Sequence, residues 1–290
     1  MSSSDARELD TIAPPAGFGL KSLRVIAAIT DDGVAPAVLA GADAIAEMAC
    51  ADTEALHVGH ENPVLGQAAR ELGMTLRTLA GNAVEAILDA CAAEDVAALV
   101  IGARASSVAA RAVGATTSSL ITMVDKPVVV VPPNARVVRR IERVLVPMNG
   151  TTPDGAALRQ VTQLALGLKL EVVVAHVSDR LSLPAFSDHA PHEVRAWQEE
   201  FLARHGPAAP DARLELRVGD AREHLLEILD RTGCELVALS WNRDLSGGHA
   251  EVVRSMMAES PVPVLLTSRD RELHALVGTS SPSGPAYQMP

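Results

Sequence analysis

Short apolar runs alternate with longer amphipathic stretches along most of the chain. Runs such as "RVIAA" and "VAALVIG" have the length of buried strands and are bounded by polar turns. In the stretch 81–102, a Gly turn with a polar cap precedes apolar residues spaced three and four apart, and a buried strand follows. Strands that alternate with helices predict an α/β fold, with a parallel sheet covered on both faces and right-handed crossovers.

The same order of elements occurs twice. An apolar strand and a polar turn begin at Leu23 and again at Glu142, and the segments that follow align without a gap at an offset of 119 positions. Further on, 81–102 aligns with 219–240 at an offset of 138. The chain therefore reads as a tandem duplication, and the second copy has about 19 extra residues (138 minus 119) between its second and third strands.

The repeats predict two tandem domains, each with a doubly wound, five-stranded parallel sheet. The extra residues of the second copy lie within 181–210, which reads as a Pro-bounded loop followed by a helix over 192–205. The expected parts of the chain are a disordered tail over 1–21, domain 1 over 22–133, a linker over 134–141, domain 2 over 142–268 and a disordered tail over 269–290.

Composition excludes several classes of function. The formal net charge is -11 and aromatic residues make up 2% of the chain, whereas nucleic-acid binding needs clustered Lys and Arg and gains from aromatic stacking. Because no apolar run approaches the roughly 18 residues of a membrane helix and the N-terminus lacks a signal-peptide pattern, we expect a cytoplasmic protein without membrane contact. The three cysteines are far apart in sequence and read as reduced thiols.

The ordered set of motifs resembles the universal stress protein family. The resemblance lies in the "LHV" and "AHV" strand ends, the "GNAVEAI" turn and helix, and a Gly loop after the fourth strand that leads to a proline-led fifth strand, Pro127 matching Pro263. It implies strand order 3-2-1-4-5 in each domain. It also implies an internal pseudo-dimer paired through the fifth strands, with a further homodimer left open. The second copy is similar to a degenerate type found in actinobacteria.

Family members that bind ATP carry a G-x2-G-x9-G-(S/T) pattern after the fourth strand. Glycines let the backbone approach phosphates, and N–H groups at the next helix start bind their charge. In the family, the fifth-strand proline follows the last motif Gly by 13 positions. Pro127 therefore places the last motif Gly at Gly114, and Gly102 stands at the first motif Gly. The middle Gly is absent, the spacer has eight residues instead of nine, and the hydroxyls are shifted to Thr116 and Thr117.

These members also carry an Asp just after the first strand, and here that position falls on Thr30, with Asp31 and Asp32 following. Arg104, in the Gly loop, is a candidate phosphate partner, with a solvated surface charge as the alternative. The resemblance implies ATP as the ligand, with Mg²⁺ only as companion of the nucleotide. The expected binding set is Ala28, Thr30, Asp31, Val58, Ile101, Gly102, Arg104, Gly114, Thr116 and Thr117.

The second copy departs further from the pattern. Ser240 replaces the first Gly and Arg243 stands at the middle Gly. Glu251 occupies the phosphate-side hydroxyl position, where a carboxylate would repel a phosphate. Asn149 replaces the Asp that follows the first strand. We therefore expect no ATP binding in domain 2.

Two histidine patterns favour structure over metal binding. His57 and His60 form an HxxH pair, but His57 corresponds to His176, after which no second His follows at that spacing. "HEVRA" at 192 lacks the second His of a zinc helix. Packing is therefore the preferred role of His57, and no metal site is expected.

The sequence predicts a non-catalytic, stress-associated regulatory protein that binds an adenine nucleotide in domain 1. One alternative is a nucleotide-free interaction module whose working surface, for a protein partner, is the inserted helix with Trp197 and Phe201. A third class is a weak ATP hydrolase, although no residue stands out as a general base.

Overall fold

The computed structural model describes residues 22–103, 114–148, 161, 165, 168–178, 199, 212–245 and 247–267, with backbone alone for 247–249. Its first half has the elements β1 (Arg24–Ala28), α1 (Ala35–Ala49), β2 (Asp52–Val58), α2 (Pro63–Glu71), β3 (Thr75–Leu79), α3 (Ala83–Cys91), β4 (Val96–Gly102), α4 (Ala115–Met123) and β5 (Val128–Val131). The second half has β6 (Arg143–Met148), β7 (Glu171–Ser178), β8 (Arg213–Val218), α7 (Ala221–Thr232), β9 (Leu236–Ser240), α8 (Gly247–Glu259) and β10 (Val264–Thr267).

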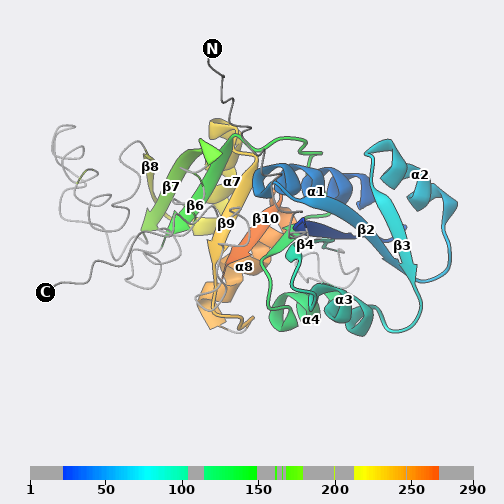
Figure 1. The fold of residues 1–290 in the computed structure, drawn as a ribbon. Coiled ribbons are helices and arrows are strands. Elements are labelled where there is room, and N and C mark those ends of the chain that lie inside the picture. Colours follow the sequence, from blue (N-terminus) through cyan, green and yellow to red (C-terminus); the bar gives the residue numbers. More distant parts are fainter. Residues whose placement is uncertain are drawn as a thin grey trace, which may run out of the picture.

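The ten strands of the described residues form one sheet, in the order β3-β2-β1-β4-β5-β10-β9-β6-β7-β8 (Figure 1). Each half is parallel and has the predicted 3-2-1-4-5 order. The fifth strands β5 and β10 pair antiparallel, with Leu265 opposite Val129. The two five-stranded sheets therefore join into a continuous sheet with the fifth strands at its centre.

Strand register reproduces the repeat. Val25 pairs with Thr53, and Val144 pairs with Val172, so both residues of the second pair are shifted by 119 positions. Between the first and fourth strands of each half, Val25 pairs with Ala98 and Val144 with Leu236, and the fourth strand is shifted by 138 positions. The offsets found in the sequence are therefore also the offsets of the hydrogen-bonded ladders.

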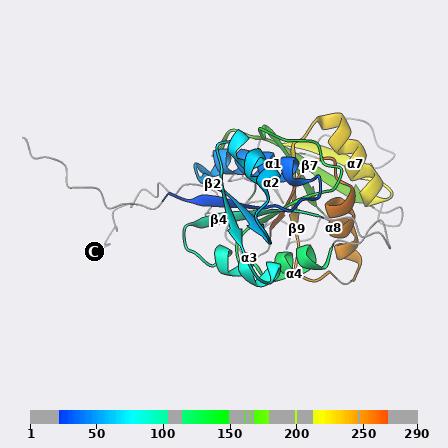
Figure 2. The same cartoon turned by 90° about the vertical axis from the view of Figure 1, so that its right-hand side faces the viewer.

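Helices cover the first-half strands on both faces. Figure 1 shows α1 and α2 on one side of these strands and α3 and α4 on the other. In Figure 2, α3 lies next to α4, and α7 next to α8. The central strands β4 and β5 are almost entirely buried, as expected for the near-continuous apolar runs of a sheet covered on both faces.

Polar caps begin three of the helices. The side-chain oxygens of Asn62, Asn82 and Asp220 accept N–H groups from the first turns of α2, α3 and α7. Asn82 and Asp220 are equivalent under the repeat, being 138 positions apart. The helix α4 differs, because its N-cap is Gly114, which has no side chain that could accept these N–H groups.

His57 and His176 have the same structural contact. Nδ1 of His57 lies 3.1 Å from the carbonyl oxygen of Ile29, and Nδ1 of His176 lies 3.0 Å from that of Met148. Each ring thus ties the end of the second strand to the end of the first. Within the part of the chain that the structure describes, no three His, Cys, Asp or Glu residues are grouped to hold a metal ion.

The segment that connects the halves contacts the second half. Val138 and Ile141 are buried, and the Arg136 guanidinium donates to the carbonyl oxygen of Cys234 at 2.8 Å. Apart from Glu199, the inserted helix lies outside the described residues, as do both expected tails, Arg104 and Asn149.

Candidate functional site

A cavity of about 430 Å³ opens at the carboxyl ends of β1, β2 and β4. This is the edge of the sheet where ligands bind in doubly wound folds. Strand ends, the first turns of α1 and α3, and the start of α4 all contribute to it. Its lining consists of Ala28, Ile29, Thr30, Asp32, Ala35, Val38, Leu56, Val58, Ala83, Ile87, Ile101, Gly102, Gly114, Ala115, Thr116, Thr117 and Leu120.

Most of the predicted binding set meets at this cavity. The cavity is lined by eight of the ten predicted residues: Ala28, Thr30, Val58, Ile101, Gly102, Gly114, Thr116 and Thr117. Asp31 does not line it; its carboxylate accepts a hydrogen bond from Nδ2 of Asn62 at 3.2 Å. Arg104 lies outside the described residues.

Asp32 is the acidic side chain at the cavity. Its carboxylate accepts the hydroxyl of Thr30 at 2.6 Å and the N–H of Val34 at 3.3 Å. Both contacts arise from a tight turn, in which the Asp32 N–H donates to the Thr30 carbonyl oxygen at 3.0 Å. The turn therefore presents a carboxylate that can accept hydrogen bonds from a ligand's hydroxyl groups.

The apolar wall includes residues that were not in the predicted set. Leu56 and Ile87 are buried there, and Val38 and Leu120 enter from α1 and α4. The only available signal was helical spacing, because Ala83 and Ile87 lie four positions apart and share a helix face. This wall can accept a flat, apolar ligand surface.

The polar end of the cavity is built by Gly102 and the start of α4. A Cβ at Gly102 would lie 3.4 Å from methyl groups of both Val34 and Val38, so this position leaves little room for a larger residue. The hydroxyl of Thr117, which is 5% exposed, donates to the Gly102 carbonyl oxygen at 3.1 Å. Thr116 is exposed at the mouth. The N–H groups of this first turn are available to an anion, because the Gly114 cap supplies no acceptor.

The second half has a much smaller cavity of about 90 Å³ at the equivalent place. Pro147 stands at the position of Ala28, and Ser240 at that of Gly102. Its lining is Pro147, Met148, Ala175, Val177, Ala221, Leu225, Leu239, Ser240, Val252 and Val253. Val252 and Val253 take the places of Thr116 and Thr117, so the hydroxyls found in the first half are replaced by methyl groups.

Two further substitutions in the second half have visible structural consequences. Arg243, at the middle-glycine position, adopts a left-handed backbone conformation with φ 63°, and its Nη2 atom lies 3.3 Å from Oδ1 of Asp125 in the first half. Trp241, which stands where the first half has Ala103, is 3% exposed and belongs to the core. The loop that holds a ligand in the family pattern here contacts the other half of the molecule.

The family model described as "Universal stress protein family" matches residues 20–132 and, a second time, residues 140–268. The chain belongs to the universal stress protein family. The two matches cover both halves of the duplication.

Solved structures support the fold of this universal stress protein. A functionally unknown protein from Pseudomonas aeruginosa matches with a TM-score of 0.58 and 14% identity, covering 88% of this chain and 96% of that one. A universal stress protein from Archaeoglobus fulgidus matches with a TM-score of 0.58 and 16% identity, covering 86% and 99%. No curated protein sequence matches the chain significantly. Among the described residues of this universal stress protein, no helix has the length and apolar character needed to cross a membrane.

Proposed function

We propose that the chain is a regulatory stress-response protein that binds an adenine nucleotide, such as ATP, in its first half. The contrast between two equivalent cavities carries the proposal. The first has about 430 Å³, within the range of small-molecule sites, and the second has about 90 Å³, well below it. Only the first combines an apolar wall with a carboxylate and an uncapped helix start.

The residues at the first cavity fit the parts of a nucleotide. The base would contact apolar residues that line the cavity, namely Ala28, Val58 and Ile101. Asp32 would accept hydrogen bonds from ribose hydroxyls. The first-turn N–H groups of α4 after Gly114 would receive the phosphate charge. Mg²⁺ would be bound by the nucleotide's phosphates rather than by a preformed protein site.

A matched pair of variants tests the location of the site. Val58 and Val177 are equivalent, line the two cavities and are both half-buried. Calorimetric titration of ATP into the full chain is expected to show that Val58→Trp weakens binding at least about tenfold, equal to about 1.4 kcal/mol, because the indole fills the cavity. Val177→Trp is expected to leave the affinity unchanged.

A second pair tests the anion end. Gly114→Glu places a carboxylate beside the N–H groups of α4 and is expected to abolish binding. Glu251→Ser, at an exposed position of the second half, is expected to have no effect. Absence of heat at millimolar ATP, or loss of affinity in the Val177 or Glu251 variants, would overturn the assignment. Phosphate release from the same samples at the rate of buffer alone would separate binding from hydrolysis.

A further inference from the structure

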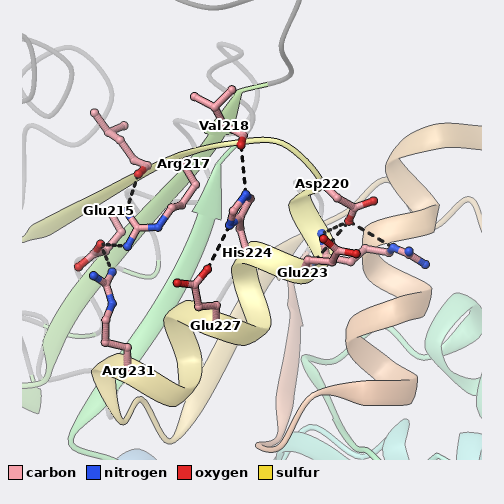
Figure 3. Close-up of polar contacts among 10 residues, drawn as sticks. Glu215, Arg217, Val218, Asp220, Glu223, His224, Glu227 and Arg231 are labelled. Atoms are coloured by element: carbon pink, nitrogen blue, oxygen red, sulfur yellow. Dashed lines mark hydrogen bonds and ion pairs between the residues drawn. The ribbon is translucent and has the colours of Figure 1, made fainter. Parts of the chain in front are cut away.

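Three arginines surround one buried carboxylate at the outer strand of the second half. Arg213 contacts Oε1 of Glu215 at 2.8 Å, and Arg217 contacts Oε2 at 3.2 Å. Arg231, from α7, also contacts Oε2, and Figure 3 shows Arg217 and Arg231 directed at this carboxylate. The Glu215 side chain is 7% exposed, whereas those of Arg213 and Arg231 are 53% and 45% exposed. The group therefore has two positive charges in excess and still presents N–H donors to solvent.

In the first half, Arg77 of β3 stands at the position of Glu215 and belongs to a balanced group that spans β1, β2 and β3. There Arg24 contacts Glu54 and Asp95, and Arg77 contacts Glu54, so two arginines face two carboxylates. Under the offset of 138, the β3 residues Thr75, Arg77 and Leu79 correspond to Arg213, Glu215 and Arg217 of β8. Among the described residues, the outer strand of the second half thus has a positive excess that the outer strand of the first half lacks, within a chain whose net charge is -11.

β8 is also the last strand of the sheet. It pairs with β7 and with no other strand in the described part of the chain. Arg213 and Arg217 lie four residues apart on one face of it, which corresponds to about 13 Å along an extended strand. The opposite face carries Leu214, Leu216 and Val218, and Val218 is 42% exposed.

We propose that the outer edge of β8 binds an extended peptide whose acidic residues lie four positions apart, with a neutral residue midway and apolar residues between. Such a peptide adds a strand to the sheet edge, because a strand's side chains repeat at the same spacing as those of β8. Its two carboxylates then meet Arg213 and Arg217, and its neutral residue lies beside Glu215. Because Glu215 already fixes the guanidinium groups, binding orders fewer side chains.

The competing interpretation is that the charges only protect a sheet edge against aggregation, as charged residues on edge strands do. That interpretation predicts no dependence on the spacing of acids in a peptide. The two can be separated with synthetic peptides and the full-length protein, without reference to nucleotide binding.

The probe is a fluorescent peptide with the core Glu-Leu-Ser-Leu-Glu, measured by fluorescence anisotropy at low salt. A peptide of identical composition with the core Glu-Leu-Ser-Glu-Leu places the acids on opposite faces, and an N-methylated version of the first core cannot donate backbone hydrogen bonds to β8. We expect both control peptides to bind at least about tenfold more weakly than the probe, a difference of about 1.4 kcal/mol. The affinity of the probe should also fall as salt is raised.

The protein variant removes Arg213 and Arg217 together by Arg→Ser substitution, leaving the ion pair between Glu215 and Arg231. We expect at least about tenfold weaker binding of the probe. The control is Arg70→Ser with Arg140→Ser, which changes the net charge equally at exposed positions elsewhere. Absence of binding to the native chain, equal affinity for the three peptides, or equal loss in both double variants would overturn the proposal.

Discussion

Burial gives the three cysteines different chemistry. Cys50 is exposed, whereas Cys91 and Cys234 are buried. Burial raises the pKa of the Cys91 thiol from 9.0 to about 12, and it also raises the pKa of Cys234. Because the thiolate is the reactive form, we expect a disulfide reagent at pH 8 to label one thiol in the native protein and three in denaturant. Labelling of a second native thiol would contradict the burial of Cys91 and Cys234.

The raised pKa of Cys91 also makes the stability of the protein depend on pH. An unfolded thiol loses its proton near pH 9, and the buried one does so only near pH 12. The stabilising contribution is therefore complete below pH 9 and decreases as the pH rises from 9 towards 12. The Cys91→Ala variant lacks this ionisable thiol. Between pH 9 and pH 12, its free energy of unfolding, measured with urea, should therefore decrease less than that of the native chain.

At the residue scale, the sequence identified the acids after β1 but not their roles. Asp31 and Asp32 are adjacent, and only the turn hydrogen bonds decide which carboxylate faces the cavity. Thr30 and Val34 hold Asp32. Asn62, which is distant in sequence, holds Asp31 outside the lining. A contact from another element leaves no local signal, so the spacing alone could not choose between the two.

At the element scale, two equivalent turns differ in how they tolerate a side chain. Gly81 and Gly219 precede α3 and α7 and have positive φ values of 107° and 140°. A Cβ at Gly81 meets nothing within 4 Å, but at Gly219 it lies 2.9 Å from Nε2 of His224. That ring is held at both nitrogens, by the Val218 carbonyl oxygen at 3.1 Å and the Glu227 carboxylate at 3.2 Å (Figure 3).

We therefore expect both Gly→Ala variants to lose stability, and Gly219→Ala to lose more. Backbone strain costs about 1–3 kcal/mol at such positions. At Gly219 the displaced His224 adds the loss of a hydrogen bond, worth about 1 kcal/mol. Urea unfolding followed by circular dichroism measures both. An equal loss in the two variants would show that the His224 ring moves aside without cost.

The succession of the strands and its repetition were predictable from local patterns in the sequence, whereas the order of the strands in the sheet came from the family resemblance. The apolar strands, their polar turns and the caps Asn82 and Asp220 recur at constant offsets, and the ladders have the same offsets. The cavity wall was less predictable, because Val38 and Ile87 reach it only through the rotation of α1 and α3 against the sheet. The charge excess on β8 was also missed, since Arg231 joins it from a separate element.

At the scale of the whole molecule, the central strand pair links the two halves into one sheet. The paired residues of these two strands are at most 1% exposed: Val128, Val129 and Val130 on β5, and Val264, Leu265 and Leu266 on β10. Gly41 on α1 also approaches the other half, because a Cβ there would lie 3.7 Å from Cγ of Pro263. If the halves separated, these apolar surfaces would enter water. Unfolding of one half is therefore expected to destabilise the other.

Probes confined to each half can test this coupling. Both tryptophans, Trp197 and Trp241, belong to the second half, and the buried thiol of Cys91 belongs to the first. In urea, tryptophan fluorescence and Cys91 labelling should give the same midpoint in a Cys50→Ser, Cys234→Ala background, because one cooperative transition unfolds both halves.

Leu265→Ala perturbs the central pair from the second half alone. A cavity at this buried position should cost about 2–5 kcal/mol and shift both midpoints equally. Val64→Ala, on α2 at 69% exposure, should shift neither. If Leu265→Ala moved only the tryptophan transition, the antiparallel contact between β5 and β10 would join two independently stable domains. If both midpoints moved together, the larger cavity of the first half would depend for its stability on a half whose own cavity measures only about 90 Å³.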